Sequence, residues 1–311
     1  MLNNEKINTL SQQLNIKNIY LDSGGIYGYT ICGCLQVLKD FNLLNNIENI
    51  LGCSVGGLVG MLLALDYSTE EIFRVAYNLE INKLINFKKN NLFNIFRNYG
   101  FDNGEKLKNI IRFLIKKKSN NSELTFLELF NLTKKNLSII VNNINFRKFE
   151  VFNKDTTPNL EVWKAIRITC SFPLIFTPVL LNDNYYIDGG NTLNNTNYFS
   201  NKEETIGILL EKNSNHNFKI NNFEDFIKNV LYTPLKSLKF SQYNNINCFE
   251  IETNGLKINC LDFTIKNETK SYLYNFGYQE MLKQIETVLT NMVKYKNLKN
   301  KKFKSQGTQT E

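Results

Sequence analysis

The segment 47–60 constrains the fold of this chain more than any other. It leads from an apolar stretch through Gly52-Cys53-Ser54-Val55-Gly56 into further small and apolar residues. This order predicts a strand, a sharp turn and a helix, with Ser54 at the tip of the turn. Gly52 and Gly56 give the backbone room to turn tightly, and the turn would present the Ser54 hydroxyl at the positive end of the helix. An ordinary glycine-rich turn fits the same five residues, so other parts of the chain must decide.

The composition is that of a globular protein. With 311 residues, of which 42% are hydrophobic, the chain can bury a core as one large domain or two closely joined ones. The net charge of +8 suits an anionic membrane surface or nucleic acid, but no nucleic-acid motif is present. The N-terminus lacks a signal-peptide pattern, and the longest apolar stretch, 55–65, is too short to span a bilayer. We therefore expect a cytoplasmic protein that attaches to membranes peripherally.

The cysteines argue against a metal site. Six of them lie at positions 32, 34, 53, 170, 248 and 260, with no CxxC pair, and the chain has one histidine. This pattern predicts reduced, mostly buried thiols. We expect neither a metal nor a cofactor.

A second glycine-rich segment lies near the N-terminus. The β-like run 17–21 is followed by Asp22-Ser23-Gly24-Gly25-Ile26-Tyr27-Gly28 and then by helical spacing over 29–41. The backbone N–H groups of such a loop would bind a phosphate or stabilise the oxyanion of an acyl transfer. The glycine spacing and the Gly-Lys-Ser/Thr ending of phosphate-binding loops are missing. Because a serine turn follows about 25 residues later, the oxyanion interpretation is favoured.

A third signal is a hairpin that ends in an aspartate. Strand-like residues over 177–181 and 185–187 flank the turn 182–184, and the second strand leads into Asp188-Gly189-Gly190. An Asp-Gly turn occurs in many proteins and carries weight here only together with the other two segments.

Periodicity and composition predict the remaining elements. Helices are expected over 69–84, 104–118, 160–170, 222–240 and 270–296, with a capped helix start at Thr125, and strands within 136–153, 205–211 and 248–252. The segment 86–104 mixes cations with aromatics and fits either an irregular connection or a mobile flap facing lipid. The lysine-rich end, 294–311, fits either a disordered tail or a basic patch for membranes or nuclear import.

Taken together, these blocks resemble the patatin-like phospholipases, also called lipid acyl hydrolases. The resemblance rests on residues 23–35, 52–57, 165–179 and 187–195, with a similar connecting segment at 98–106, and extends over roughly residues 17–200. It implies an α/β fold of three layers, in which helices flank a central, mostly parallel β-sheet. With this patatin-like catalytic core at 17–200, we expect a polar lead (1–16) before it, a C-terminal α/β part of the same domain (201–293) after it, and a basic tail (294–311), which we expect to be disordered.

The resemblance also implies roles for individual residues. Ser54 would be the nucleophile, Asp188 its base, and Gly24 and Gly25 the oxyanion-hole donors. Supporting motif positions are Gly28, Gly52, Gly56, Gly189 and Gly190. Two positions depart from the family pattern, because Ser23 replaces a glycine and Tyr27 replaces a basic residue.

The expected activity is hydrolysis of fatty-acyl esters of phospholipids or acylglycerols through a Ser-Asp dyad and an acyl-enzyme. A carboxylate acting as the base would need a partly desolvated site. Two alternatives remain. One is a catalytically weakened lipid-binding protein with the same fold. The other is an α/β-hydrolase-type esterase in which His216 completes a Ser54-Asp188-His216 triad, although His216 lies in a polar stretch.

Overall fold

The computed structural model describes residues 3–85, 95, 97–190, 198–211, 247–253, 256, 258 and 261–307. The strands of its main sheet are β1 (Asn18–Leu21), β2 (Asn49–Cys53), β4 (Asn136–Asn143), β5 (Lys148–Phe152), β7 (Val179–Leu181), β8 (Asn184–Asp188), β9 (Thr205–Glu211) and β10 (Cys248–Glu252). They follow the order β10-β9-β1-β2-β4-β8-β7, with β5 paired to β4. A small second sheet pairs β3 (Gly100–Asp102) with β6 (Leu174–Phe176).

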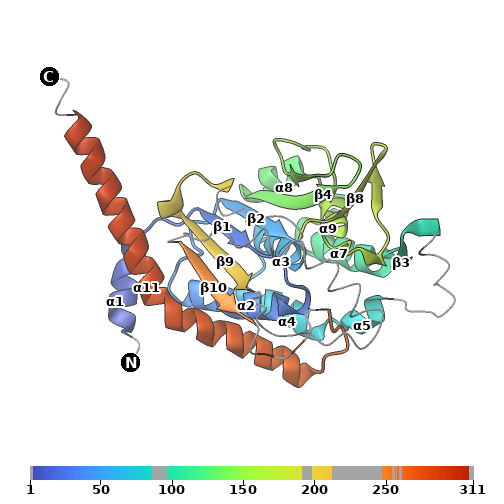
Figure 1. Cartoon of the computed structure of the whole chain (residues 1–311), viewed down its shortest axis with the longest axis horizontal. Coiled ribbons are helices and arrows are strands. Elements are labelled where there is room, and N and C mark those ends of the chain that lie inside the picture. The colour runs from blue at the N-terminus through green and yellow to red at the C-terminus, as the bar shows by residue number, and fades with distance from the viewer. Residues whose placement is uncertain are drawn as a thin grey trace.

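The main sheet has a parallel half and an antiparallel edge. The pairs from β10 through β9, β1 and β2 to β4 are all parallel, whereas β5, β8 and β7 are added antiparallel. β1 is buried along its whole length, as expected for a parallel strand that is covered on both faces. The expectation of an α/β fold with a mostly parallel sheet flanked by helices is confirmed (Figure 1).

The helices are α1 (Asn4–Gln13), α2 (Gly28–Asp40), α3 (Val55–Ala64), α4 (Thr69–Asn78), α5 (Ile81–Leu84), α7 (Glu105–Ser119), α8 (Phe126–Thr133), α9 (Val162–Thr169) and α11 (Asn267–Gly307), with short 3-10 helices η1 (Gly25–Tyr27) and η4 (Lys202–Glu204). The apolar helix α3 packs on β1, β2 and β4, and α9 packs on β4 and β8. No helix among the described residues combines the length and the apolar character that a bilayer crossing needs.

The single helix expected over 69–84 is two helices. A capping box between Ser68 and Glu71 starts α4, but the chain becomes extended at Leu79 and resumes as the short helix α5. The ammonium group of Lys270 donates to the carbonyl oxygens of Tyr77 and Leu79 at 2.7 and 3.0 Å. A distant residue therefore satisfies carbonyls at the end of α4, which local periodicity could not reveal.

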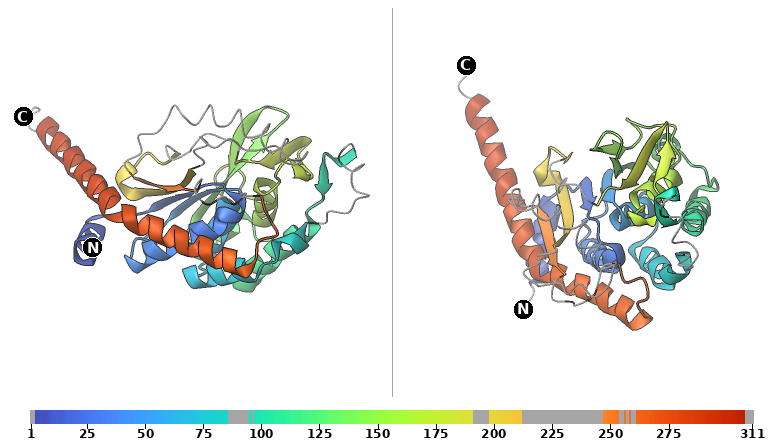
Figure 2. Two further views of the ribbon diagram at one scale, coloured as in Figure 1. Left: turned by 60° about the horizontal axis from the view of Figure 1, so that its bottom comes forward. Right: turned by 45° about the vertical axis from the view of Figure 1, so that its right-hand side comes forward.

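The basic end is helical where the sequence suggested disorder. α11 continues to Gly307, and its C-terminal part projects beyond the rest of the protein (Figure 2). Lys296 donates to the carbonyl oxygen of Gln13 at 2.6 Å, and Lys299 forms an ion pair with Glu203. These contacts hold the first part of the expected tail against the protein. The expected helix 222–240, residues 86–94 and 96 of the proposed flap, His216 and Cys260 lie outside the described residues.

Helices α2 and α11 lie side by side with their backbones in contact (Figure 1). A Cβ atom on Gly33 would lie 2.0 Å from the carbonyl oxygen of Tyr274, and one on Gly277 would lie 2.1 Å from that of Thr30. The Cys34 thiol also donates to the carbonyl oxygen of Gly277 at 3.4 Å. The two glycines therefore set the distance between these helices.

We expect Gly277→Ala to lower the free energy of unfolding by at least about 2 kcal/mol, because the added methyl group would push α11 away from α2. Chemical denaturation measures this change. The matched control is Asn275→Ala, at an exposed position two residues earlier on the same helix, which should leave stability unchanged or slightly raised because alanine favours helices. Equal stability of the two variants would contradict the backbone contact.

Candidate active site

Ser54 occupies a strained turn between β2 and α3. Its backbone angles are φ 53° and ψ −125°, a combination that residues with a side chain rarely adopt. Close packing enforces the turn, since a Cβ atom on Gly52 would lie 2.6 Å from the carbonyl oxygen of Gly56, and one on Gly56 would lie 2.3 Å from that of Leu21. The predicted strand, sharp turn and helix are present, with Ser54 at the tip.

Thr169 at the end of α9 forms a hydrogen bond with the backbone of this turn. The Ser54 N–H donates to the Thr169 hydroxyl oxygen at 2.8 Å, and that hydroxyl donates to the carbonyl oxygen of Ile140 in β4 at 2.7 Å. Thr169 is fully buried. The sequence analysis did not single it out, because its position in a helical stretch gave no sign of a contact with the serine turn.

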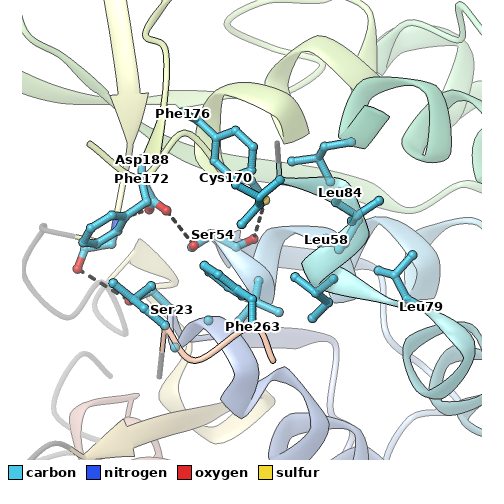
Figure 3. A pocket seen from close by; sticks show the side chains of 18 residues that line it. Ser23, Ser54, Leu58, Leu79, Leu84, Cys170, Phe172, Phe176, Asp188 and Phe263 are labelled. Atoms are coloured by element: carbon cyan, nitrogen blue, oxygen red, sulfur yellow. Dashed lines mark hydrogen bonds between the residues drawn. The ribbon is translucent and has the colours of Figure 1, made fainter. Parts of the chain in front are cut away.

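Ser54 and Asp188 face each other across the site. The Ser54 hydroxyl donates to Asp188 Oδ2 at 2.7 Å (Figure 3). The other carboxylate oxygen, Oδ1, accepts the N–H of Gly190 at 2.7 Å, and Asp188 is only 4% exposed. The carboxylate is therefore oriented by the glycine pair that follows it, with one oxygen directed at the serine.

The glycine-rich loop borders the same site. Ser23, Gly24 and Gly25 line a pocket together with Ser54 and Asp188. Gly25 has φ 55°, a backbone conformation that favours glycine. Ser23 has no positive φ, so its backbone conformation suits a residue with a side chain. Within the described residues, the N–H groups of Gly24 and Gly25 donate no hydrogen bond. Both N–H groups can therefore donate to an acceptor bound in the pocket.

The carboxylate of Asp22 connects the glycine-rich loop to neighbouring residues by hydrogen bonds. Its Oδ1 accepts the N–H of Ser23 at 2.8 Å and the hydroxyl of Tyr20 at 3.1 Å, while its Oδ2 accepts the N–H of Leu210 at 3.1 Å. Burial, together with the Asp22 charge, raises the pKa of Tyr20 well above its ordinary value, so the phenol stays a donor. Asp22 was missed as a site residue, although its place between the strand and the glycine loop was a usable signal.

The three other glycines of the predicted motifs serve close packing. A Cβ atom on Gly28 would lie 2.3 Å from the Val55 side chain. One on Gly189 would lie 2.4 Å from the carbonyl oxygen of Ile140, and one on Gly190 would lie 2.9 Å from the Ser23 side chain. These contacts bring the glycine loop, the serine turn and the end of β8 together.

The pocket beside Ser54 is apolar and has a volume of about 130 Å³. Its walls come from α3, α5, α7, the residue after α4, the segment after α9 and the segment before α11. The apolar side chains include Leu58, Leu79, Ile81, Leu84, Leu107, Phe172, Phe176, Leu261 and Phe263 (Figure 3). A cavity of about 150 Å³ is known to hold benzene, so this pocket has room for an apolar group of similar size. The contribution of Leu261 and Phe263 was not expected, since the chain leading to α11 carries no motif.

Two buried polar side chains tie together segments near the pocket. Buried Arg167 donates to Ser171 Oγ and to the carbonyl oxygens of Asn103 and Thr177, and burial lowers its pKa to about 10, so it remains a cation at neutral pH. Tyr27, the position that departs from the family pattern, is buried and donates to the carbonyl oxygen of Ile258 at 2.6 Å. Tyr27 therefore ties the helix after the glycine loop to the C-terminal part of the chain.

Cys170 lines the pocket next to Ser54, and its thiol is a poor nucleophile. Burial raises the pKa of its thiol, and the nearby Asp188 charge adds to this shift, so the thiol stays protonated. The five described cysteines are all free thiols. Within the described residues, the structure places no three His, Cys, Asp or Glu side chains in a group that could hold a metal ion.

Comparisons with known proteins agree on one family. A family model described as patatin-like phospholipase matches residues 19–200. The chain is 32% identical over 287 residues to an uncharacterised protein of Acanthamoeba polyphaga mimivirus, covering 87% of this chain and 94% of that protein. It is 29% identical over 174 residues to a probable lipid hydrolase of invertebrate iridescent virus 6, covering 56% of this chain and 59% of that protein.

More distant relatives share part of the chain or the fold alone. A triacylglycerol lipase of Saccharomyces cerevisiae is 31% identical over 172 residues, covering 51% of this chain and 18% of the lipase. The crystal structure of VipD from Legionella pneumophila superposes with a TM-score of 0.59 at 17% identity, over 87% of this chain and 67% of VipD. The crystal structure of the effector ExoU of Pseudomonas aeruginosa superposes with a TM-score of 0.53 at 16% identity, over 88% of this chain and 53% of ExoU.

We expect Thr169→Val to lower the free energy of unfolding by about 1–3 kcal/mol, because it leaves the Ser54 N–H and the Ile140 carbonyl without their buried partner. Thr169→Ser keeps the hydroxyl and is the matched control. Denaturation of both variants tests the contact, and a valine variant as stable as the serine variant would show that the two hydrogen bonds contribute little.

Proposed function

Because this chain belongs to the patatin-like phospholipase family, we propose that it is a serine lipid acyl hydrolase of the phospholipase A type. Its substrates are the fatty-acyl esters of phospholipids or acylglycerols. The observation that supports this proposal most is the 2.7 Å hydrogen bond from the Ser54 hydroxyl to Asp188 beside an apolar pocket. Two relatives named a lipid hydrolase and a triacylglycerol lipase support the substrate class.

The first chemical step forms an acyl-enzyme. Asp188 accepts the proton of Ser54 while Ser54 Oγ attacks the carbonyl carbon of the ester. The resulting oxyanion accepts hydrogen bonds from the N–H groups of Gly24 and Gly25. When the tetrahedral intermediate collapses, the proton passes from Asp188 to the leaving alcohol.

Water completes the reaction. It attacks the acyl-Ser54 ester, gives up a proton to Asp188 and releases the fatty acid, after which Ser54 recovers its hydrogen. The apolar pocket holds the first carbons of the acyl chain next to the ester, and it excludes water from that side of the reacting carbon. The reaction requires no metal and no cofactor. Because such substrates reside in membranes, peripheral attachment of a cytoplasmic enzyme is part of this proposal.

We expect Ser54→Ala and Asp188→Asn each to lower the hydrolysis of phospholipid and short-chain esters by at least about a thousandfold. The first removes the nucleophile and the second removes the base, and both keep the shape of the side chain nearly unchanged. The measurement is turnover of fluorescent esters by purified protein, with circular dichroism to verify the fold.

Thr169→Ser is a suitable control, because it keeps the hydroxyl next to the turn. Near-normal turnover in either the Ser54 or the Asp188 variant would refute the dyad. Wild-type protein that binds lipid vesicles but releases no fatty acid would instead favour the alternative of a lipid-binding protein with the same fold.

The second alternative, a Ser-Asp-His triad, depends on the one histidine of the chain, His216. In the proposed dyad Asp188 already contacts Ser54 directly, so we expect His216→Ala to keep activity within about threefold of wild type. Removal of a triad histidine costs several powers of ten. Loss of hydrolysis in a folded His216→Ala protein would replace the dyad with a triad.

A further inference from the structure

Two neighbouring hairpins carry an exposed apolar surface. β4 and β5 are joined by residues 144–147, and β7 and β8 by residues 182–183. The large side chains on and beside these hairpins are between 43% and 65% exposed; they are Tyr99, Ile144, Phe146, Phe149 and Leu180. We call these five residues the hairpin surface. Large apolar patches on soluble proteins commonly mark sites of interaction.

Tyr185 in β8 connects the members of this surface. Leu180 in β7 pairs with Tyr185. The carbonyl oxygen of Tyr185 accepts the N–H of Ile144 at 3.0 Å. Its ring meets that of Tyr99 edge to face, with 5.8 Å between the centroids. The exposed side chains therefore come from segments that are joined by direct contacts.

The hairpin surface lies at the same end of the sheet as Ser54. β2 and β4 are parallel, and Cys53, which precedes Ser54, pairs with Ile140. β4 then continues past Ile140 to the turn, which at about 3.3 Å per residue places Ile144 roughly 13 Å beyond that level. β4 and β8 lie on the opposite side of the molecule from the C-terminal end of α11 (Figure 1), so this surface is separate from the basic end of the chain.

Charged side chains of both signs lie at the two turns. Arg147 is in the β4–β5 turn, and the Lys148 ammonium lies 5.4 Å from the centre of the Phe146 ring. Lys148 also pairs with Glu150 at 3.3 Å, and Asp183 is in the other turn. The net charge is therefore small, so the apolar side chains would supply most of the attraction, with Arg147 and Lys148 adding a preference for acidic lipid.

We propose that the hairpin surface docks on a bilayer containing anionic phospholipid. The proposal rests on the proposed function, because an enzyme acting on membrane lipids must bring its nucleophile to the bilayer. Phe146 and Leu180 enter the boundary between headgroups and acyl chains, Tyr99 lies at the polar boundary, and Arg147 and Lys148 contact lipid phosphates. Docking in this way turns the end of the sheet that carries Ser54 toward the lipid.

The test is a double variant, Phe146→Ser with Leu180→Ser, in the full chain. We expect at least tenfold weaker co-sedimentation with vesicles of phosphatidylcholine and phosphatidylserine, and a similar loss of phospholipid hydrolysis on those vesicles. Hydrolysis of a water-soluble short-chain ester should stay within about twofold, because neither residue lines the pocket. A second double variant, Arg147→Gln with Lys148→Gln, should weaken binding about fivefold to the mixed vesicles and leave binding to phosphatidylcholine alone unchanged.

The matched control is Leu132→Ser. Leu132 is an exposed leucine on α8, just before the amino end of β4 and thus at the other end of the sheet. Unchanged vesicle binding in the first double variant, or an equal loss in the control, overturns the proposal. If the Phe146→Ser, Leu180→Ser variant changes oligomeric state in the absence of lipid, the surface binds a second copy of the chain. This result also overturns the proposal.

Vesicle binding by Ser54→Ala separates this proposal from the proposed function. If that variant binds vesicles and the first double variant does not, docking holds even if the chain proves to have no hydrolase activity. If wild-type protein hydrolyses soluble esters but ignores both kinds of vesicle, the function holds and the docking surface is refuted.

Discussion

The hydrogen bond between Ser54 and Asp188 depends on how three strands are arranged. Ser54 follows β2, Asp188 ends β8, and β4 lies between these two strands. Because β8 runs antiparallel to β4, its last residue pairs with Val141, one position beyond the pair of Cys53 and Ile140. The antiparallel edge of the sheet thus delivers an acid to the end of the sheet where the parallel strands deliver a serine. A shift of β8 by one residue would move this carboxylate to the other face.

Glycines make this arrangement possible by letting backbones touch. In the serine turn, Gly56 meets the end of β1, and Gly189 after β8 meets β4. The same device recurs between α2 and α11 at Gly33 and Gly277. A helix that begins outside the motif-bearing part of the chain is therefore held against the helix that follows the glycine loop. This contact links the C-terminal part of the chain to the geometry of the site.

The site separates its polar and apolar tasks. The carboxylate of Asp188 and the glycine loop supply the polar groups beside Ser54, and leucine and phenylalanine side chains supply most of the remaining pocket lining. Burial keeps the Cys170 thiol protonated although it lies beside Ser54, and it leaves Arg167 charged within its hydrogen bonds. An apolar setting that excludes water strengthens the few polar contacts that remain in it.

The sequence alone determined the local geometry. The serine turn, the glycine loop and the strand leading to Asp188 each follow from short-range rules on glycine, apolar runs and turns, and the family follows from their order. Only the tertiary structure decided what these segments touch. Thr169 behind Ser54, Lys270 at the end of α4, and Leu261 and Phe263 in the pocket are all distant in sequence from the segments that they contact. α11 continues to Gly307 where the composition suggested a disordered tail, and Lys296 and Lys299 in this part of it have partners on other elements. Contacts of this kind depend on how helices and strands pack, which periodicity along one chain does not encode.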